Sequence, residues 1–208
     1  MCGKEKGIFK MKEKSTVDAI ILAAGYASRA DGFKMQFKIG EKAVLQYVIE
    51  AFVPICKKII VVGGYQSDKL LPLIKPYGNQ VQLVINDSFE AGMFSSVKVG
   101  VKEVNSSRFF LTPGDCPLIT KQVCQTLLES NKDFVIPSFQ KKGGHPVLLP
   151  ASCIKELLLE EEESNLKQFL KKQSLTYIEM QEDGIIYDLD TRQDYLWLKE
   201  RMKAQEGK

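Results

Sequence analysis

Residues suited to bind phosphate groups follow the first apolar segment of the chain, residues 17–23. That segment leads into Ala24 and Gly25, and the cationic side chains of Arg29 and Lys34 follow a short distance later. Small side chains let a ligand lie directly on the backbone, where exposed N–H groups can bind phosphate oxygens. Arginine and lysine can neutralise the negative charge that these amides do not reach. The pattern therefore predicts a site for the phosphates of a nucleotide on the loop between Ala24 and Lys34.

The spacing of this loop excludes two common phosphate-binding patterns. The P-loop pattern G-x-x-x-x-G-K-[ST] fails because Ala30 stands where its second glycine is needed, and the dinucleotide pattern G-x-G-x-x-G is absent. Without Arg29 and Lys34, a tight turn would be the better interpretation of Gly25. Their presence favours phosphate binding over that alternative.

One carboxylate is placed to bind a divalent metal ion. Asp115 follows the apolar segment 108–111 and lies between Pro113 and Pro117. Mg²⁺ accepts one or two protein carboxylates and completes its coordination with water and substrate phosphates. Beside a phosphate-binding loop, Asp115 is therefore predicted to be a magnesium ligand. The alternative is an aspartate that only stabilises a turn.

Two further aspartates and the only histidine are candidates for the same site. Asp188 and Asp190 alternate along an expected strand end and so point the same way, which makes either one a candidate second metal ligand. The alternative is that Asp190 or Thr191 caps the helix that follows. A lone histidine is more often structural than catalytic. In its Gly-Gly-His-Pro turn, His145 is a candidate to donate to a phosphate oxygen of the acceptor.

Segments with the patterns of strands and helices alternate along the chain, which predicts a largely parallel sheet covered by helices. Strands are expected at residues 17–23, 59–62, 81–85, 108–111, 134–136, 147–149, 177–180 and 185–187. Helices are expected at residues 43–52, 67–75, 95–104, 120–130, 152–159, 165–172 and 192–203. Ligands of such folds bind outside the carboxyl ends of the strands. The small or polar residues expected to meet at that edge are Ala24-Gly25, Gly63-Gly64, Asn86-Asp87 and Asp115.

Composition and charge limit the classes of protein to which the chain can belong. Its 208 residues suit one α/β domain, expected over residues 16–208, with the lysine-rich residues 1–15 as a disordered leader. The net charge of +3 argues against a nucleic-acid-binding protein. No apolar segment has the roughly 20 residues needed to cross a membrane. Five widely spaced cysteines without a C-x-x-C pair argue against a disulfide framework and a zinc site. These features together predict a cytoplasmic protein.

The order of these motifs resembles that in the molybdenum cofactor nucleotidyltransferases. The resemblance covers about residues 17–197, and its motifs are Leu22-Ala23-Ala24-Gly25 with Arg29 and Lys34, Asn86-Asp87 with Gly92 to Ser96, Gly114 to Pro117, Gly144 to Val147, and Asp188 to Tyr195. It implies a Rossmann-like three-layer nucleotidyltransferase fold of the α/β class with a mostly parallel central sheet. The last two motifs point to the cytidylyltransferase branch.

The resemblance also implies an activity, the Mg²⁺-dependent transfer of CMP from CTP to the phosphate of molybdopterin with release of pyrophosphate. Arg29, Lys34 and Asp115 would be the catalytic residues, and Asp115 and Asp190 would bind Mg²⁺. The expected nucleotide- and acceptor-binding residues are Leu22, Ala23, Ala24, Gly25, Lys34, Asp87, Ser96 and His145. Ala24 favours CTP over GTP, because the guanylyl branch usually carries glycine at that position.

Departures from the family pattern leave other functions open. Ala27 replaces a usual serine, Ala30-Asp31 replaces a usual Met-Gly pair, and residues 162–167 differ from a segment expected on the acceptor side. The alternatives are a GTP-dependent guanylyltransferase, a transferase for another cytidylyl or sugar-phosphate acceptor, and a non-catalytic protein that delivers the cofactor. A molybdenum hydroxylase is the candidate protein partner.

Overall fold

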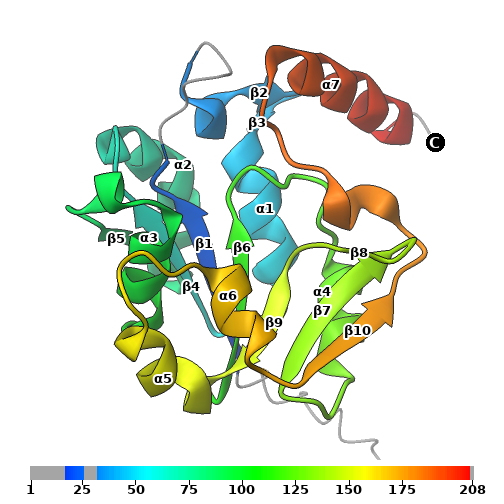
Figure 1. Cartoon of the computed structure of the whole chain (residues 1–208). Coiled ribbons are helices and arrows are strands. Elements are labelled where there is room, and N and C mark those ends of the chain that lie inside the picture. Colours follow the sequence, from blue (N-terminus) through cyan, green and yellow to red (C-terminus); the bar gives the residue numbers. More distant parts are fainter. Residues whose placement is uncertain (1–16, 26–31, 207–208) are drawn as a thin grey trace, which may run out of the picture.

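A mixed, mostly parallel sheet of eight strands forms the centre of the protein, and helices cover both of its faces (Figure 1). The structure, a computed structural model, describes residues 17–25 and 32–206. The strand order is β10-β7-β9-β6-β1-β4-β5, with β8 paired to β7. Within this sheet, β8 and β9 run antiparallel to their neighbours. The α/β class with a mostly parallel sheet is therefore confirmed.

The bounds of the elements are close to those expected. The strands are β1 (Val17–Ala23), β4 (Lys58–Gly63), β5 (Val81–Ile85), β6 (Arg108–Pro113), β7 (Phe134–Phe139), β8 (Lys142–Gly143), β9 (Val147–Pro150) and β10 (Leu175–Glu179), with a separate hairpin of β2 (Lys38–Ile39) and β3 (Lys42–Ala43). The helices are α1 (Val44–Phe52), α2 (Leu71–Ile74), α3 (Met93–Val101), α4 (Lys121–Leu128), α5 (Ile154–Leu159), α6 (Leu166–Lys171) and α7 (Arg192–Glu206). The 3-10 helices are η1 (Lys34–Gln36), η2 (Ser67–Leu70), η3 (Lys75–Gln80), η4 (Phe89–Ala91), η5 (Ala151–Cys153) and η6 (Asp183–Ile186). No helix in the described ranges is long and apolar enough to cross a membrane.

Alternation of side chains along β1 divides the core into two layers. All seven residues of β1 are buried. Ala19 and Ile21 belong to the apolar cluster that α1, α2 and α4 cover, whereas Ile20 and Leu22 belong to the cluster that α3, α5 and α6 cover. A strand buried on both faces is typical of a parallel sheet between two layers of helices. The three-layer arrangement expected from the sequence is thus confirmed.

Two expected elements differ from the structure. The strand expected at residues 185–187 is wrong, because this segment forms η6 instead. A Cβ atom at Gly184 would lie 2.7 Å from the carbonyl oxygen of Leu118, and this close packing holds the segment as a turn. The helix expected at residues 67–75 is divided into η2 and α2. Pro72 lacks the N–H that a continuous α-helix would need at this point.

The carboxyl ends of β1, β4, β5 and β6 meet at one edge of the sheet, as the sequence predicts. Leu22 in β1 pairs with Val62 in β4 and with Pro113 in β6, and β5 runs parallel to β4. Strand β9 runs antiparallel to β6, so its first residue lies at this edge. His145, two residues before β9 begins, lies there too. Candidate residues far apart in the sequence are therefore gathered at this edge.

Helix α7 packs beside the β2–β3 hairpin and brings the end of the chain to the start of the fold. The Tyr195 hydroxyl donates to the carbonyl oxygen of Lys38 (2.6 Å), and its ring centre lies 5.1 Å from that of Phe37. Leu189 and Leu198 form a small apolar cluster with residues of the hairpin and of α1. This packing holds the segment before α7 close to η1.

Asp18 in β1 is a buried carboxylate that organises the turn before β6. Its oxygens accept bonds from the N–H groups of Asn105 (2.8 Å) and Ser106 (3.0 Å) and from the Ser106 hydroxyl (2.9 Å). Asp18→Ala would leave the two buried donors of Ser106 without an acceptor, so we expect the free energy of unfolding to fall by about 3 kcal/mol. Urea denaturation would measure it. The exposed Asp68→Ala is the control, with an expected change within about 0.5 kcal/mol. Equal losses in the two variants would contradict this role of Asp18.

Candidate active site

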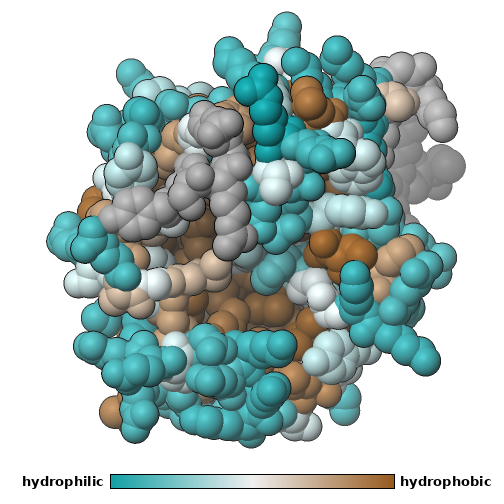
Figure 2. Space-filling model, turned by 45° about the horizontal axis from the view of Figure 1, so that its top comes forward, coloured by the Kyte–Doolittle hydropathy of each residue, from teal (hydrophilic) through white to brown (hydrophobic). Residues whose placement is uncertain are grey.

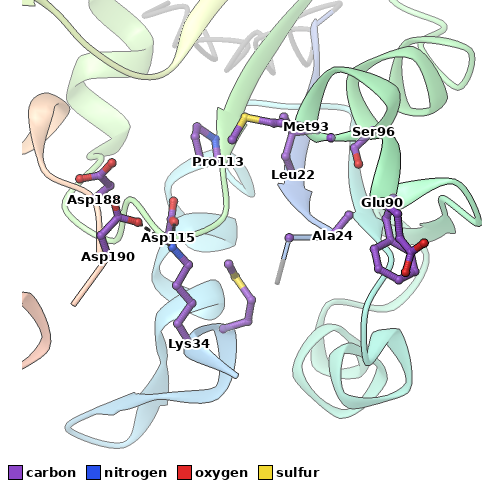
Figure 3. Close-up of a pocket in the computed structure, with 14 residues that line it drawn as sticks. Leu22, Ala24, Lys34, Glu90, Met93, Ser96, Pro113, Asp115, Asp188 and Asp190 are labelled. Carbon is purple, nitrogen blue, oxygen red and sulfur yellow. Dashed lines mark hydrogen bonds and ion pairs between the residues drawn. The ribbon is translucent and has the colours of Figure 1, made fainter. Parts of the chain in front are cut away.

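A cavity of about 420 Å³ lies at the edge where the parallel strands end. Figure 2 shows a hollow in this face of the protein, with apolar side chains exposed in it and hydrophilic ones around it. The residues that line the cavity are Leu22, Ala24, Gly25, Lys34, Met35, Phe89, Glu90, Gly92, Met93, Ser96, Pro113, Asp115, Asp188 and Asp190. Figure 3 shows that Asp115, Asp188, Asp190 and Lys34 lie on one side of Ala24, and Glu90 and Ser96 on the other.

The Lys34 ammonium group is surrounded by three oxygen atoms. Its Nζ lies 2.5 Å from Asp115 Oδ2 and 3.0 Å from Asp190 Oδ1, and it donates to the Leu189 carbonyl at 2.9 Å (Figure 3). The Lys34 and Asp115 side chains are only 17% and 13% exposed. Burial by itself lowers the pKa of Lys34, but the charges and hydrogen bonds of Asp115 and Asp190 outweigh it, and the pKa is raised. Lys34 therefore stays positively charged at neutral pH.

Asp115 reaches the cavity because Gly114 lets β6 pass close to β1. The Gly114 N–H donates to the Leu22 carbonyl (2.8 Å). A Cβ atom at Gly114 would lie 2.9 Å from the sulfur of Met35 and 3.2 Å from that same carbonyl oxygen. A larger residue there would push apart the strand end and η1, which carries Lys34. The glycine before Asp115 is thus part of the geometry of the Lys34–Asp115 pair.

The structure separates the two roles that the sequence left open for Asp190 and Thr191. The Thr191 hydroxyl accepts from the N–H of Asp194 (3.1 Å), and Asp194 Oδ2 accepts from the N–H of Thr191 (2.7 Å). This reciprocal pair is a capping box at the start of α7. Thr191 is therefore the cap, while the Asp190 carboxylate is turned toward Lys34.

Asp188 is a third carboxylate on the wall of the cavity. Partial burial, together with the negative charges of Asp190 and Asp115, raises its pKa. Burial is the larger cause, and the repulsion between the neighbouring carboxylates adds to it. A cation added to this side of the cavity would relieve that repulsion.

His145 lies at the same edge but is not among the residues that line the cavity. The backbone N–H of His145 donates to the Ile185 carbonyl (2.8 Å), and the Nδ1 atom of its ring is buried without a hydrogen-bond partner among the described residues. Burial lowers its pKa, although the charge of Asp115 acts in the opposite direction. The imidazole is therefore neutral at pH 7, and its role toward an acceptor stays a prediction.

The far side of the cavity is organised by Asn86 rather than by Asp87. Asn86 is buried, and its side-chain amide donates to the hydroxyls of Ser95 (2.8 Å) and Ser96 (2.9 Å). Ser96 lines the cavity, as its predicted binding role requires. Asp87 is exposed and is not among the lining residues, so the structure does not place it with the others.

The sequence predicted no role at the site for the other six lining residues, which are Met35, Phe89, Glu90, Gly92, Met93 and Pro113. Phe89 reaches the cavity because Gly64 has no side chain, since a Cβ atom there would lie 2.6 Å from Phe89 Cβ and 2.9 Å from Ala24 Cβ. The Gly63-Gly64 pair at the end of β4 is the signal that could have indicated a close approach of another segment. Met93 is 65% exposed, which is high for an apolar side chain.

Only some of the remaining predicted residues line the cavity. Leu22, Ala24 and Gly25 line the cavity, whereas Ala23 is buried below it in the core. Arg29 lies outside the described residues, as does the leader expected at residues 1–15. The roles of all these residues in binding or catalysis stay predictions.

The donor set around Lys34 is of the kind that a divalent cation prefers. Carboxylate and carbonyl oxygens from Asp115, Asp190 and Leu189 converge within 3.0 Å of one point, the Lys34 Nζ. No preformed group of three or more His, Cys, Asp or Glu side chains that could hold a metal is found in the part of the chain that the structure describes. Mg²⁺ does not require such a group, because water and substrate phosphates supply most of its ligands.

Fold and site together define an α/β protein with a cavity lined by a lysine and several carboxylates at the carboxyl edge of its sheet, where ligands of such folds bind. The model of the MobA-like NTP transferase domain matches residues 19–177, and the chain belongs to this family. It is a nucleotidyltransferase by family, as the motif order predicted.

Two relatives support this family, and a solved structure shares the fold. The chain is 30% identical over 190 residues to a molybdenum cofactor cytidylyltransferase of Escherichia coli, which covers 90% of this chain and 97% of that protein. It is 26% identical over 186 residues to a probable molybdenum cofactor guanylyltransferase of Methanosarcina mazei, covering 83% of this chain and 82% of the relative. A nucleotidyl transferase from Methanothermobacter has the same fold, with a TM-score of 0.79 at 17% identity over 91% of this chain and 98% of that one.

Proposed function

We propose that this chain is a Mg²⁺-dependent cytidylyltransferase that transfers CMP from CTP to the phosphate of a molybdopterin-type acceptor and releases pyrophosphate. The observation that carries the proposal is the cluster of Lys34, Asp115 and Asp190 in one cavity with the Ala24-Gly25 strand end. To bind a triphosphate, a site requires a cationic side chain, carboxylates that can hold a metal ion, and backbone N–H groups that the phosphates can reach. The 30% identity to a cytidylyltransferase supports the choice of nucleotide and acceptor.

Asp115 and Asp190 would hold the metal ion, with Asp188 on the same wall of the cavity. A bound divalent ion would neutralise phosphate charge and orient the α-phosphate. The raised pKa of Asp188 is consistent with this placement, because the negative charges of Asp190 and Asp115 add to the effect of partial burial.

In the reaction, an oxygen of the acceptor phosphate forms a bond to the α-phosphorus of CTP. The bond from this phosphorus to the oxygen that bridges to the β-phosphate breaks, and its electron pair leaves with pyrophosphate. Lys34, with Arg29 from the preceding loop, would stabilise the negative charge that grows there. Since the acceptor phosphate is already ionised at neutral pH, no side chain has to remove a proton. The chain acts by positioning and by electrostatic stabilisation.

Ala24 supplies a prediction about the choice of base. Its methyl group lies at the wall of the cavity close to Phe89, as the tight space at Gly64 shows. Removing this methyl group in Ala24→Gly makes room for a larger base, so we expect the ratio of kcat/KM for GTP to that for CTP to rise about tenfold. Steady-state kinetics with each nucleotide would measure it. An unchanged ratio would show that Ala24 does not determine which base the site accepts.

A panel of nucleotides and acceptors tests the proposed function directly. The full chain is incubated with Mg²⁺, labelled CTP or GTP, and either molybdopterin, methylerythritol phosphate or a hexose 1-phosphate, and pyrophosphate and labelled product are measured. We expect product from CTP and molybdopterin. Product with GTP but not with CTP would identify the chain as a guanylyltransferase. Product with a different acceptor would show that molybdopterin is not the substrate. Without product, calorimetric titration with CTP and Mg²⁺ decides whether the chain binds nucleotide at all.

A further inference from the structure

Lys34 occupies the position that the proposed function gives to the metal ion. The oxygens of Asp115, Asp190 and Leu189 all point at its Nζ, at 2.5, 3.0 and 2.9 Å. Two cations cannot share this point, because they would repel each other where burial weakens the screening by water. The lysine must therefore leave before these oxygens can bind another cation.

We propose that Lys34 is a built-in substitute for the metal ion, and that it moves from the carboxylates to the nucleotide phosphates when the metal–nucleotide complex binds. This inference rests on the proposed function and adds an exchange of cations to it. In the absence of nucleotide, Lys34 balances the charge of Asp115 and Asp190. In its presence, the phosphates offer the ammonium group a second set of oxygens, and the divalent ion takes over the first.

The carboxylates are held in place by contacts that do not involve the lysine. The Leu189 N–H donates to the Asp115 carbonyl (2.9 Å), which ties the segment before α7 to the end of β6. The Asp190 N–H donates to Asp194 Oδ2 (3.2 Å) at the start of α7. These backbone contacts keep the two carboxylates together after Lys34 has moved.

The phosphates would lie within reach of the same lysine. Gly25, at the predicted phosphate-binding strand end, lines the same cavity as Lys34 and Asp115. Lysine has a flexible stem of four methylene groups, so its ammonium group can change partners without movement of the backbone. Figure 3 shows the Lys34 side chain extended along the cavity with its nitrogen at Asp115.

Exchange of this kind makes metal and nucleotide binding depend on each other. A divalent ion alone has to displace Lys34 into water, whereas a metal–nucleotide complex gives it new partners. By linkage, each ligand then raises the affinity for the other. Removing the charge of Lys34 should therefore have opposite effects on the two ligands. The metal ion alone should bind more tightly, and the triphosphate should bind more weakly.

Titration of the full chain with Mn²⁺ and no nucleotide, followed by the electron paramagnetic resonance of free Mn²⁺, tests the exchange. We expect Lys34→Gln and Lys34→Met to lower the Kd for Mn²⁺ at least about tenfold. Lys58→Gln is the matched control, because Lys58 also binds a carbonyl and a carboxylate, both of Glu103, but lies at the opposite edge of the sheet. Asp115→Asn added to Lys34→Gln should abolish the gain. Circular dichroism confirms that each variant is folded.

The outcomes separate this inference from the proposed function. An unchanged or higher Kd in both Lys34 variants overturns the exchange, even where the wild-type chain transfers CMP. A gain that Lys58→Gln shares also overturns it, because it would then reflect net charge only. A gain confined to Lys34 supports the exchange, even where the panel of acceptors gives no product and the proposed function fails.

Discussion

Asp115→Asn should reduce kcat/KM with CTP at least about a thousandfold, equivalent to about 4 kcal/mol of transition-state stabilisation. Asp115 is less exposed than Asp190, at 13% against 48% of the side chain, and it is the second residue after β6. An amide keeps its size but removes the charge that a divalent cation requires. Because the side chain lines an open cavity, water can solvate Lys34 in the variant. The free energy of unfolding should therefore change by no more than about 2 kcal/mol.

Pyrophosphate release with CTP and acceptor measures this loss, and urea denaturation checks the fold. Asp68→Asn changes the charge equally at an exposed position in η2 and should retain the wild-type rate. Wild-type turnover in Asp115→Asn would show that the carboxylate has no part in the reaction. A loss of activity together with a large loss of stability would instead assign it a structural role.

Much of the fold was predictable because the signals are local. The segment 17–23 is apolar apart from Asp18, and the structure buries all of it in β1. Turn residues end β4, β5 and β6, so the edge that collects Gly64, Asn86 and Asp115 followed from parallel pairing. Lys34 and Asp115 could be selected as candidates for the same reason.

The contacts of the site were less predictable because they depend on tertiary packing. The Lys34–Asp190 pair requires α7 to pack on the β2–β3 hairpin, a hairpin that the sequence pattern did not show. Phe89 lines the cavity only because Gly64 admits it. Asp87, the second residue after β5, is exposed to solvent, whereas Asn86 before it is buried. Local patterns thus indicated the segments at the site but not which side chain of each segment reaches it.

The strand expected at residues 185–187 was also predicted from a local pattern that tertiary packing overrides. The same packing predicts a large loss of stability when Gly144 is replaced. The apolar Ile185-Ile186 pair resembles a strand, yet its backbone is held against the turn that carries His145. A Cβ atom at Gly144 would lie 2.3 Å from the Ile185 carbonyl oxygen and 2.8 Å from its carbonyl carbon. Both obstacles are backbone atoms, which cannot rotate away as a side chain can. The glycine of the Gly-His-Pro-Val motif is thus explained by packing.

Gly144→Ala should lower the free energy of unfolding by about 3 kcal/mol, because the added methyl group has to displace η6. Gly143→Ala is the matched control: its Cβ would approach only side-chain atoms of Ile136 (3.3 Å) and Tyr177 (3.4 Å), and the expected loss is about 1 kcal/mol or less. Urea denaturation of both variants measures the difference. Since η6 leads through Leu189 to Asp190, displacement of η6 should also weaken the Lys34–Asp190 contact and raise KM for CTP. Equal stability of the two variants would mean that the turn moves freely, and packing would then no longer explain the glycine.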